Sequence, residues 1–192
     1  MNIAVFVLRG QPVHNAHLEI IKSAIETYDR LIVVLGSHRA PITIRNPWPF
    51  EIRKQMIISS LGEKEKNKIV VEGIRDFLYS IHTWTTSLQS IVANNTKPGD
   101  RIHLLGHFKD DSSFYLKCFP QWRFRSVDAI HNEIGRRIDG TNIRTMIFEG
   151  DTKWKYYVPA FVQSMIEYYM STDNYKTMRK EYEFIQKYKQ SW

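Results

Sequence analysis

The chain has 192 residues, 43% of them apolar, which is enough for one large core and excludes a disordered chain. Its longest apolar runs are far shorter than the roughly 20 residues of a membrane span, and no secretory signal precedes the first strand-like run, so we expect no membrane segment. The single cysteine, Cys118, excludes an intrachain disulfide and is compatible with a reducing compartment, so we expect a cytoplasmic protein.

The formal net charge of +7 is compatible with nucleic acid or with a site that holds several phosphates. The arginines lie beside glycine, proline and histidine in predicted loops, whereas the lysines gather on predicted solvated faces. This distribution favours phosphate sites and disfavours a nucleic-acid surface.

Short runs of β-branched and apolar residues alternate with helical patterns along most of the chain. The predicted strands are Ile3–Leu8, Leu31–Leu35, Ile69–Glu72, Ile102–Leu105 and Arg123–Val127. Strand, helix, strand alternation predicts an α/β, Rossmann-like doubly wound parallel sheet of about five strands, with ligands beyond the carboxyl ends of the strands. After Asp151 the pattern is purely helical. We therefore expect a core over residues 1–150 and a helical extension over residues 151–192, packed on the same domain.

The loop after the first predicted strand carries His14 and His17 immediately before a helix. Backbone amides and the helix dipole favour an anion at such a junction, so a phosphate chain fits there. Both histidines can donate hydrogen bonds to a departing pyrophosphate, and Arg9 adds a forked cation. The alternative is that the histidines only cap the helix and pack on the sheet. A zinc site is disfavoured because no third ligand follows at a metal-binding spacing, so we expect no metal held by protein ligands alone.

The segment from Gln11 to Leu18 resembles the nucleotidylyltransferase signature Gly-Arg-Phe-Gln-Pro-x-His-x-Gly-His, in the version of the nicotinamide-mononucleotide adenylyltransferases. The resemblance implies that Gln11 and Pro12 bind ATP and that the two histidines and Arg9 are catalytic. Three residues depart from the signature: Leu8, Gly10 and Ala16. The alanine carries a Cβ where the family has glycine, so we expect a tighter approach of backbone to nucleotide.

Further matches follow the second predicted strand, in the Gly-Ser pair that includes Ser37 and in the stretch from Ile44 to Phe50. They resemble the adenylyltransferases of archaea and of bacterial Nudix-fused enzymes. The resemblance implies that Ser37, Arg45 and Asn46 bind the mononucleotide, with the arginine on its phosphate. The alternative is a proline-rigid loop with a solvated arginine.

Asp76 and Trp84 follow the third predicted strand, eight residues apart. A tryptophan face can stack on a pyridinium ring by cation-π attraction, and a carboxamide needs hydrogen-bond acceptors nearby. The resemblance implies that this pair binds nicotinamide. The alternative is a core tryptophan on the same helical stripe as Leu88.

The segment from Leu105 to Tyr115 resembles Val-Gly-His-x-Lys-Asp-Ser-Ser-Ser-Tyr-Tyr of the adenylyltransferase half of bifunctional adenylyltransferase/Nudix proteins, which implies that Gly106 binds ATP. We interpret Asp110 and Asp111 within it as loop anchors. The segment from Glu181 to Trp192 resembles the stretch that leads into the Nudix domain of those proteins.

The segment from Asp139 to Arg144 resembles the family's Ser-x-Thr-x-x-Arg element at a helix start. We expect Thr141 to be the N-cap. The resemblance implies that Thr141 holds ATP phosphates, that Ile143 also binds ATP and that Arg144 neutralises the triphosphate. The alternative is an ordinary capped helix with a surface arginine.

The resemblance as a whole implies an enzyme that transfers AMP from ATP to nicotinamide mononucleotide, giving NAD and pyrophosphate, with Mg²⁺ bound through ATP. It also allows a homo-oligomer. Two alternatives stay open. One is a sister nucleotidylyltransferase that acts on pantetheine phosphate, a flavin or a sugar phosphate. The other is a non-catalytic sensor of NAD or another nucleotide.

Overall fold

The computed structural model describes residues 1–77, 79–107, 111–127 and 138–189. Five strands form one parallel sheet in the order β3-β2-β1-β4-β5. The strands are β1 (Asn2–Leu8), β2 (Arg30–Leu35), β3 (Ile69–Gly73), β4 (Arg101–Gly106) and β5 (Arg123–Ser126). The predicted α/β doubly wound class is confirmed, and each predicted strand ends within one residue of the observed one. The strand order reverses at β1, which is where such sheets bind ligands.

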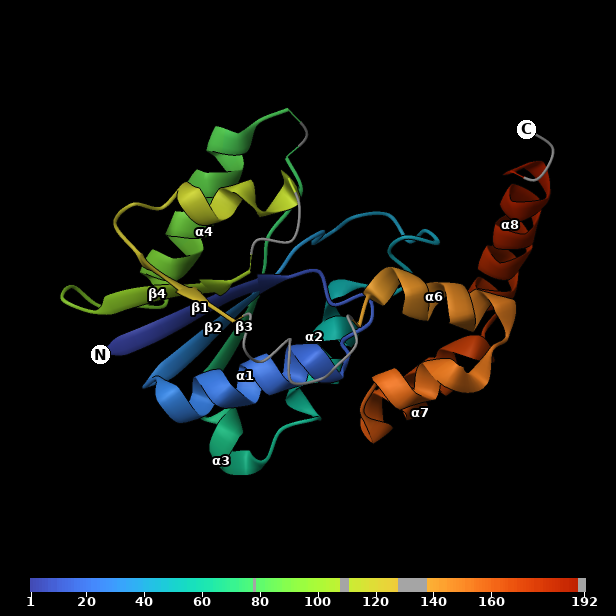
Figure 1. The fold of residues 1–192 in the computed structure, drawn as a ribbon, viewed down its shortest axis with the longest axis horizontal. Coiled ribbons are helices and arrows are strands. Elements are labelled where there is room, and N and C mark those ends of the chain that lie inside the picture. The colour runs from blue at the N-terminus through green and yellow to red at the C-terminus, as the bar shows by residue number, and fades with distance from the viewer. Residues whose placement is uncertain (78, 108–110, 128–137, 190–192) are drawn as a thin grey trace.

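Helices cover both faces of the sheet (Figure 1). One face carries α1 (Asn15–Thr27) and α2 (Phe50–Ile58), with the short α3 (Glu63–Lys66) before β3; the other carries α4 (Ile81–Asn94) and the 3-10 helix η1 (Asp111–Lys117). Successive residues of a strand point to opposite faces, so each strand serves two cores. In β1, Ala4 and Phe6 join the cluster under α1, whereas Ile3 and Val5 join the cluster under α4.

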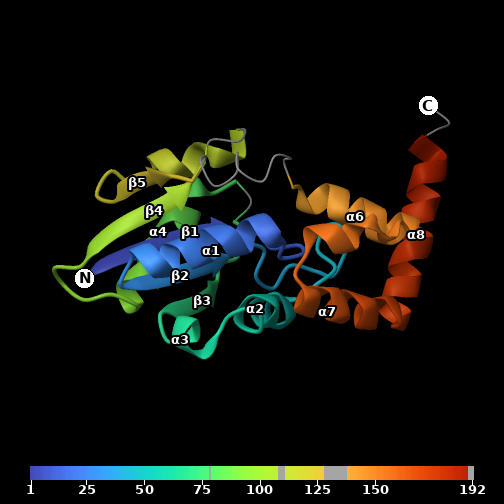
Figure 2. The ribbon, with the colours of Figure 1, turned by 60° about the horizontal axis from the view of Figure 1, so that its bottom comes forward.

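Four further helical segments gather beyond the carboxyl ends of the strands, as Figures 1 and 2 both show. They are α6 (Gly140–Glu149), η2 (Thr152–Tyr157), α7 (Ala160–Met170) and α8 (Asp173–Lys189). Phe148 of α6 stacks on Tyr175 and Tyr182 of α8, with ring centroids 5.8 and 5.5 Å apart. The Tyr175 hydroxyl donates to the Ile147 carbonyl at 2.9 Å. Through these contacts α8 braces α6, whose first turn faces the loop after β1.

No helix in the described part of the chain is both long and apolar enough to cross a bilayer.

Candidate active site

The loop after β1 turns sharply at Gly10, where φ is +63°. A Cβ at this glycine would lie 3.2 Å from Cγ2 of the buried Val13. Both the left-handed backbone and the crowding favour glycine here. Gly10, which departs from the family signature, is therefore the residue type that this loop conformation needs.

The two histidines of this loop form a stacked pair at the start of α1. Their ring centroids are 3.5 Å apart, with 19° between the planes, and His14 is buried. The backbone N–H of His14 donates to Nδ1 of His17 at 3.4 Å, so the neutral His17 ring carries its proton on Nε2. Nδ1 therefore caps the helix start, while Nε2 is a hydrogen-bond donor that suits a phosphate oxygen. The same ring can thus serve both as a helix cap and as a phosphate ligand.

The start of α6 lies directly against the same loop. The buried Arg144 donates to the Gln11 carbonyl at 2.6 Å and to the Thr141 hydroxyl at 3.2 Å. A Cβ on Gly140 would come within 2.9 Å of the Gln11 carbonyl oxygen, so the close approach needs glycine.

The prediction that Thr141 is the N-cap of this helix is wrong. Asp139 is the N-cap, and its carboxylate accepts a hydrogen bond from the Thr141 N–H at 2.7 Å. Aspartate and threonine both cap helices well, so composition alone did not decide between them. Thr141 lies instead in the first turn, with its hydroxyl oriented toward the guanidinium of Arg144.

Three predicted arginines converge on this region. Burial, followed by the charges of Arg9 and Arg45, lowers the pKa of Arg144 to about 10, against the opposing charge of Asp139. Desolvation, followed by the charge of Arg45, lowers the pKa of Arg9, while Asp76 raises it. Three cations within electrostatic range repel one another, so the arrangement suits a polyanion such as a triphosphate.

The loop after β2 connects this region to Asp76. Ser37 is buried in the left-handed conformation, with φ of 53°, and its N–H donates to the Asp76 carboxylate at 3.2 Å. Strained backbone of this kind concentrates at functional sites. Ser37 and Asp76, predicted separately, are thus in direct contact.

Arg53 of α2 holds the two loops together, a role that sequence reasoning missed. It is 1% exposed and donates to the carbonyls of Arg9 at 2.6 Å, Gly36 at 2.8 Å and Ser37 at 3.3 Å. Burial lowers its pKa to about 10. The available signal was an arginine on the inner stripe of the helix, beside the buried Met56 and Ile57.

Gln11 also has an observed structural role. Its side-chain amide exchanges two hydrogen bonds with the backbone of Trp48, at 2.8 and 3.1 Å, and so anchors the stretch that carries Asn46. The Asn46 backbone closes a turn with Thr43. In the described part of the chain the buried Oδ1 of Asn46 has no hydrogen-bond partner.

The other residues predicted to bind ATP would do so mainly through main-chain atoms. Pro12 and Ile143 are buried, the latter at 1% exposure, so they would meet a nucleotide through backbone groups. A Cβ on Gly106 would clash with Leu116, which explains glycine at the end of β4. The stretch from Phe108 to Asp110 lies outside the described residues.

Trp84 borders a separate cavity of about 460 Å³ next to this region. The cavity is lined by Asp76, Phe77, Tyr79, Ser80, Ile81, Trp84, Phe114 and Tyr115. The half-buried indole of Trp84 meets Tyr115 edge-on, with ring centroids 5.4 Å apart. Burial raises the pKa of Tyr115 to about 12, so its hydroxyl stays protonated at neutral pH. Trp84 also packs against the core cluster that contains Leu88, so the core and cavity interpretations both hold.

No group of three or more histidine, cysteine, aspartate or glutamate side chains is placed to hold a metal ion among residues 1–77, 79–107, 111–127 and 138–189. The described site consists mainly of arginine, histidine and backbone donors, which suit phosphate oxygens better than a bare cation.

Comparison with known proteins agrees with this geometry. Residues 10–119 match the family described as cytidylyltransferase-like. The chain is 29% identical to the nicotinamide/nicotinic acid mononucleotide adenylyltransferase of Acinetobacter baylyi, over 93% of this chain and 92% of that protein. It is 28% identical to the nicotinamide-nucleotide adenylyltransferase of Methanococcus vannielii, over 85% of this chain and 87% of that protein.

Among solved structures, the chain is similar to a bifunctional NMN adenylyltransferase/ADP ribose pyrophosphatase from Francisella tularensis. The TM-score is 0.87 at 28% identity; all of this chain is covered, and it spans 56% of that one. A second structure of a Francisella tularensis enzyme of that name, 27% identical, contains AMP and a manganese ion. On the family match, which covers more than half of its residues, the chain belongs to the cytidylyltransferase-like family of nucleotidyltransferases.

Proposed function

We propose that the chain is a nicotinamide-mononucleotide adenylyltransferase, which joins ATP and nicotinamide mononucleotide to give NAD and pyrophosphate. The observation that carries the proposal is the Trp84 cavity, which is joined to the phosphate-binding loops through Asp76. The cavity offers an aromatic surface and the Asp76 carboxylate for a pyridinium carboxamide, and the neighbouring loops offer Arg9 and Arg45 as cations for phosphates. The similarity to enzymes of this name over most of the chain supports the same activity.

The reaction is an in-line displacement at phosphorus. A phosphate oxygen of the mononucleotide forms a bond to the α-phosphorus of ATP, and the bond from that phosphorus to the oxygen bridging to the β-phosphorus breaks. The bridging oxygen leaves on pyrophosphate with its electron pair. Such a transfer needs positioning and charge stabilisation more than a protein nucleophile.

Nine of the predicted residues receive a side-chain or backbone role in this reaction. We assign His14, His17, Arg9 and Arg144 to the ATP phosphates, where donated hydrogen bonds strengthen as charge moves onto pyrophosphate. The hydroxyl and amide of Thr141 would hold the same phosphates. Arg45 and Ser37 would position the mononucleotide phosphate, and Asp76 and Trp84 its nicotinamide.

A divalent cation, Mg²⁺ by preference, would enter the site on the ATP phosphates and neutralise part of their charge. A related enzyme holds manganese together with AMP. The arginines and histidines described above would bind those phosphate oxygens that the cation leaves available.

The proposal is tested with a panel of phosphate acceptors. ATP labelled at the α-phosphate is offered with nicotinamide mononucleotide, nicotinic acid mononucleotide, pantetheine phosphate or flavin mononucleotide. Label should pass to a pyridine mononucleotide at the highest kcat/KM. Preferred transfer to pantetheine phosphate or the flavin would refute the proposal in favour of a sister enzyme.

The Trp84→Ala variant sharpens this test. Removing a stacking partner worth about 2 kcal/mol should raise the KM for nicotinamide mononucleotide by roughly tenfold or more. The KM for ATP should stay within about twofold, because the cavity that the indole lines includes none of the histidines and arginines assigned to ATP. Equal effects on both substrates would contradict the assignment, and Trp84→Phe should recover part of the loss.

A further inference from the structure

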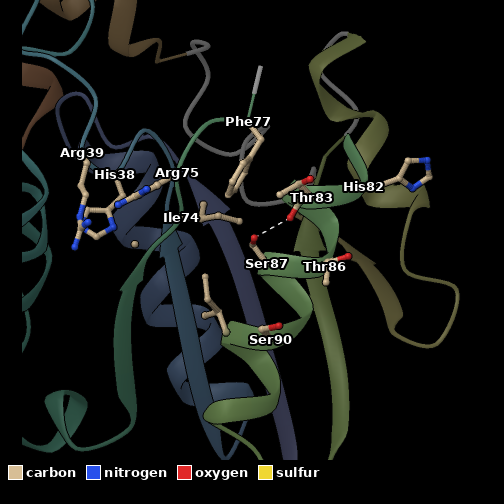
Figure 3. Close-up of a pocket in the computed structure, with 12 residues that line it drawn as sticks. His38, Arg39, Ile74, Arg75, Phe77, His82, Thr83, Thr86, Ser87 and Ser90 are labelled. Atoms are coloured by element: carbon tan, nitrogen blue, oxygen red, sulfur yellow. Dashed lines mark hydrogen bonds between the residues drawn. The ribbon is translucent and has the colours of Figure 1, made fainter. Parts of the chain in front are cut away.

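A second cavity, of about 630 Å³, lies between the end of the edge strand β3 and helix α4 (Figure 3). It shares one lining residue, Phe77, with the Trp84 cavity. Its volume is within the range of small-molecule sites. None of the residues assigned to the transfer reaction lines it.

One end of this cavity is cationic. His38, Arg39 and Arg75 come from the segments after β2 and β3, and Figure 3 shows their nitrogen-bearing ends gathered on one side. The residues that line the cavity include no aspartate or glutamate. In the described part of the chain, no hydrogen bond or ion pair occupies the guanidinium of Arg39 or Arg75.

The imidazole among these cations is held in place. The backbone N–H of His38 donates to the Ile74 carbonyl at 2.9 Å, which fixes the main chain that carries the ring. A Cβ on Gly73 would lie 2.7 Å from the ring, so the ring packs directly on the strand. Phe50 packs against it with centroids 4.7 Å apart. Burial, followed by the charges of Arg39, Arg53 and Arg75, lowers the pKa of His38, while Glu51 raises it, so the surrounding charges are mainly positive. An anion at this end would offset the repulsion between the cations.

The opposite wall is different in character. Helix α4 contributes hydroxyl side chains, and Figure 3 shows Ser87 and Ser90 on the turns that face the cavity. The Ser87 hydroxyl donates to the Thr83 carbonyl at 2.7 Å, which leaves its oxygen lone pairs as acceptors. Ile74, Ile91 and Phe77 supply apolar surface. This wall suits a small body that carries both hydroxyl groups and apolar surface.

We propose that this cavity is a second ligand site, which takes a phosphorylated small molecule of sugar-phosphate to mononucleotide size. The phosphate lies on Arg39 and Arg75, and the hydroxyl-bearing body lies along α4. Both arginines are exposed, so binding weakens as ionic strength rises.

The site is adjacent in sequence to the mononucleotide-binding loops. His38 follows Ser37 and Arg75 precedes Asp76, and Ser37 and Asp76 are joined by a hydrogen bond of 3.2 Å. A ligand in the second site therefore contacts residues that directly adjoin Ser37 and Asp76, which position the nicotinamide end of the transferase site.

Ribose 5-phosphate is the probe, titrated by calorimetry with ribose as the uncharged comparison. The purified chain is first saturated with NAD, which fills the transferase site under the proposed function. Ribose 5-phosphate should then bind with one site per chain, and ribose should not. If the chain does not bind NAD, the proposed function fails. The comparison of the parent chain with the variants described below, made without NAD, still tests the second site. The two failures are therefore distinguishable.

The double variant Arg39→Ala/Arg75→Ala should weaken ribose 5-phosphate binding on the order of tenfold or more, because two charge-assisted contacts are lost. Arg101→Ala, at the amino end of β4, is the matched control and should bind like the parent chain. Equal binding by parent and double variant would overturn the proposal. So would a double variant that changes the oligomeric state in sedimentation, since the cavity would then belong to a subunit contact.

Discussion

His17 illustrates how one side chain serves both fold and chemistry. Its Nδ1 accepts the His14 N–H at the helix start, which orients Nε2 as a donor. The sequence predicted the pair because two histidines at a loop-to-helix junction form a contiguous pattern. It did not predict the stacking at 3.5 Å, because residue types three positions apart do not specify how two rings are oriented.

Replacing His17 with alanine should lower kcat by about a hundredfold or more, since a donor that stabilises the departing pyrophosphate is lost. The KM values for both substrates should stay within about threefold. Steady-state kinetics in both substrates measures this, with Glu19→Ala on the exposed face of the same helix as the control. A raised KM with unchanged kcat would show that His17 only binds substrate.

Arg53 shows what residue-by-residue reading of a sequence cannot find. Its partners are three backbone carbonyls in two loops that lie 16 to 44 residues away. Carbonyls are present at every residue, so no residue type in those loops marks the contact. Only the folded arrangement of β1, β2 and α2 brings donor and acceptors together.

At the scale of elements, Arg53 joins the loops after β1 and β2 and so positions Arg9 and Ser37. Arg53→Met should destabilise the chain by about 3 kcal/mol or more, because buried carbonyls lose their partners. It should also lower kcat/KM at temperatures where the variant remains folded.

Urea unfolding and kinetics measure these two effects. Lys54→Met, on the next residue of the same helix, is the control and should change stability by less than about 1 kcal/mol. Similar results for Arg53→Met and Lys54→Met would mean that the two loops do not depend on the arginine.

The C-terminal helices pack against the rest of the chain, so their folding should depend on it. Phe148 packs between two tyrosines of α8, and the core cluster beneath α1 extends to both tyrosines. We propose that residues 151–192 fold together with residues 1–150 as one cooperative unit.

Calorimetry of the parent chain should therefore give a single unfolding transition. Phe148→Ala should lower the free energy of unfolding by about 3–5 kcal/mol and keep that single transition. The exposed Phe184 is the matched control, with an effect of less than about 0.5 kcal/mol on alanine substitution. Two resolved transitions would show that the extension folds separately.

Strand positions were predictable because β-branched runs between helical patterns leave little freedom of register. The start of α6 was not, because Asp139 and Thr141 are both good caps and only backbone geometry distinguishes them. The identities of the site residues follow from local motifs, whereas their grouping depends on contacts between loops. Gln11 is an example, since its amide is occupied by Trp48, 37 residues away.

At the scale of the whole molecule, His103 makes stability depend on pH. It is buried in β4, and neither ring nitrogen has a hydrogen-bond partner in the part of the chain that the structure describes. Burial, followed by the charges of Arg125, Arg123 and Arg101, lowers its pKa below the ordinary 6.5.

The sign of the effect follows from proton linkage. A lowered pKa in the folded state means that the unfolded chain binds the proton more readily, so stability is complete above about pH 6.5 and falls as the pH decreases from there. Urea unfolding at about pH 8 and pH 5.5 should show this loss, and His103→Phe should show less of it. An identical loss in parent and variant would assign the effect to other groups.

Under the proposed function, the carboxyl edge of this sheet joins ATP to nicotinamide mononucleotide. The most direct measurement is incubation of the purified chain with ATP, Mg²⁺ and nicotinamide mononucleotide, with NAD followed by a coupled dehydrogenase and pyrophosphate by a separate assay. We predict equimolar NAD and pyrophosphate, dependent on all three additions. A folded chain that binds the nucleotides and releases neither product would contradict the claim and favour a nucleotide sensor.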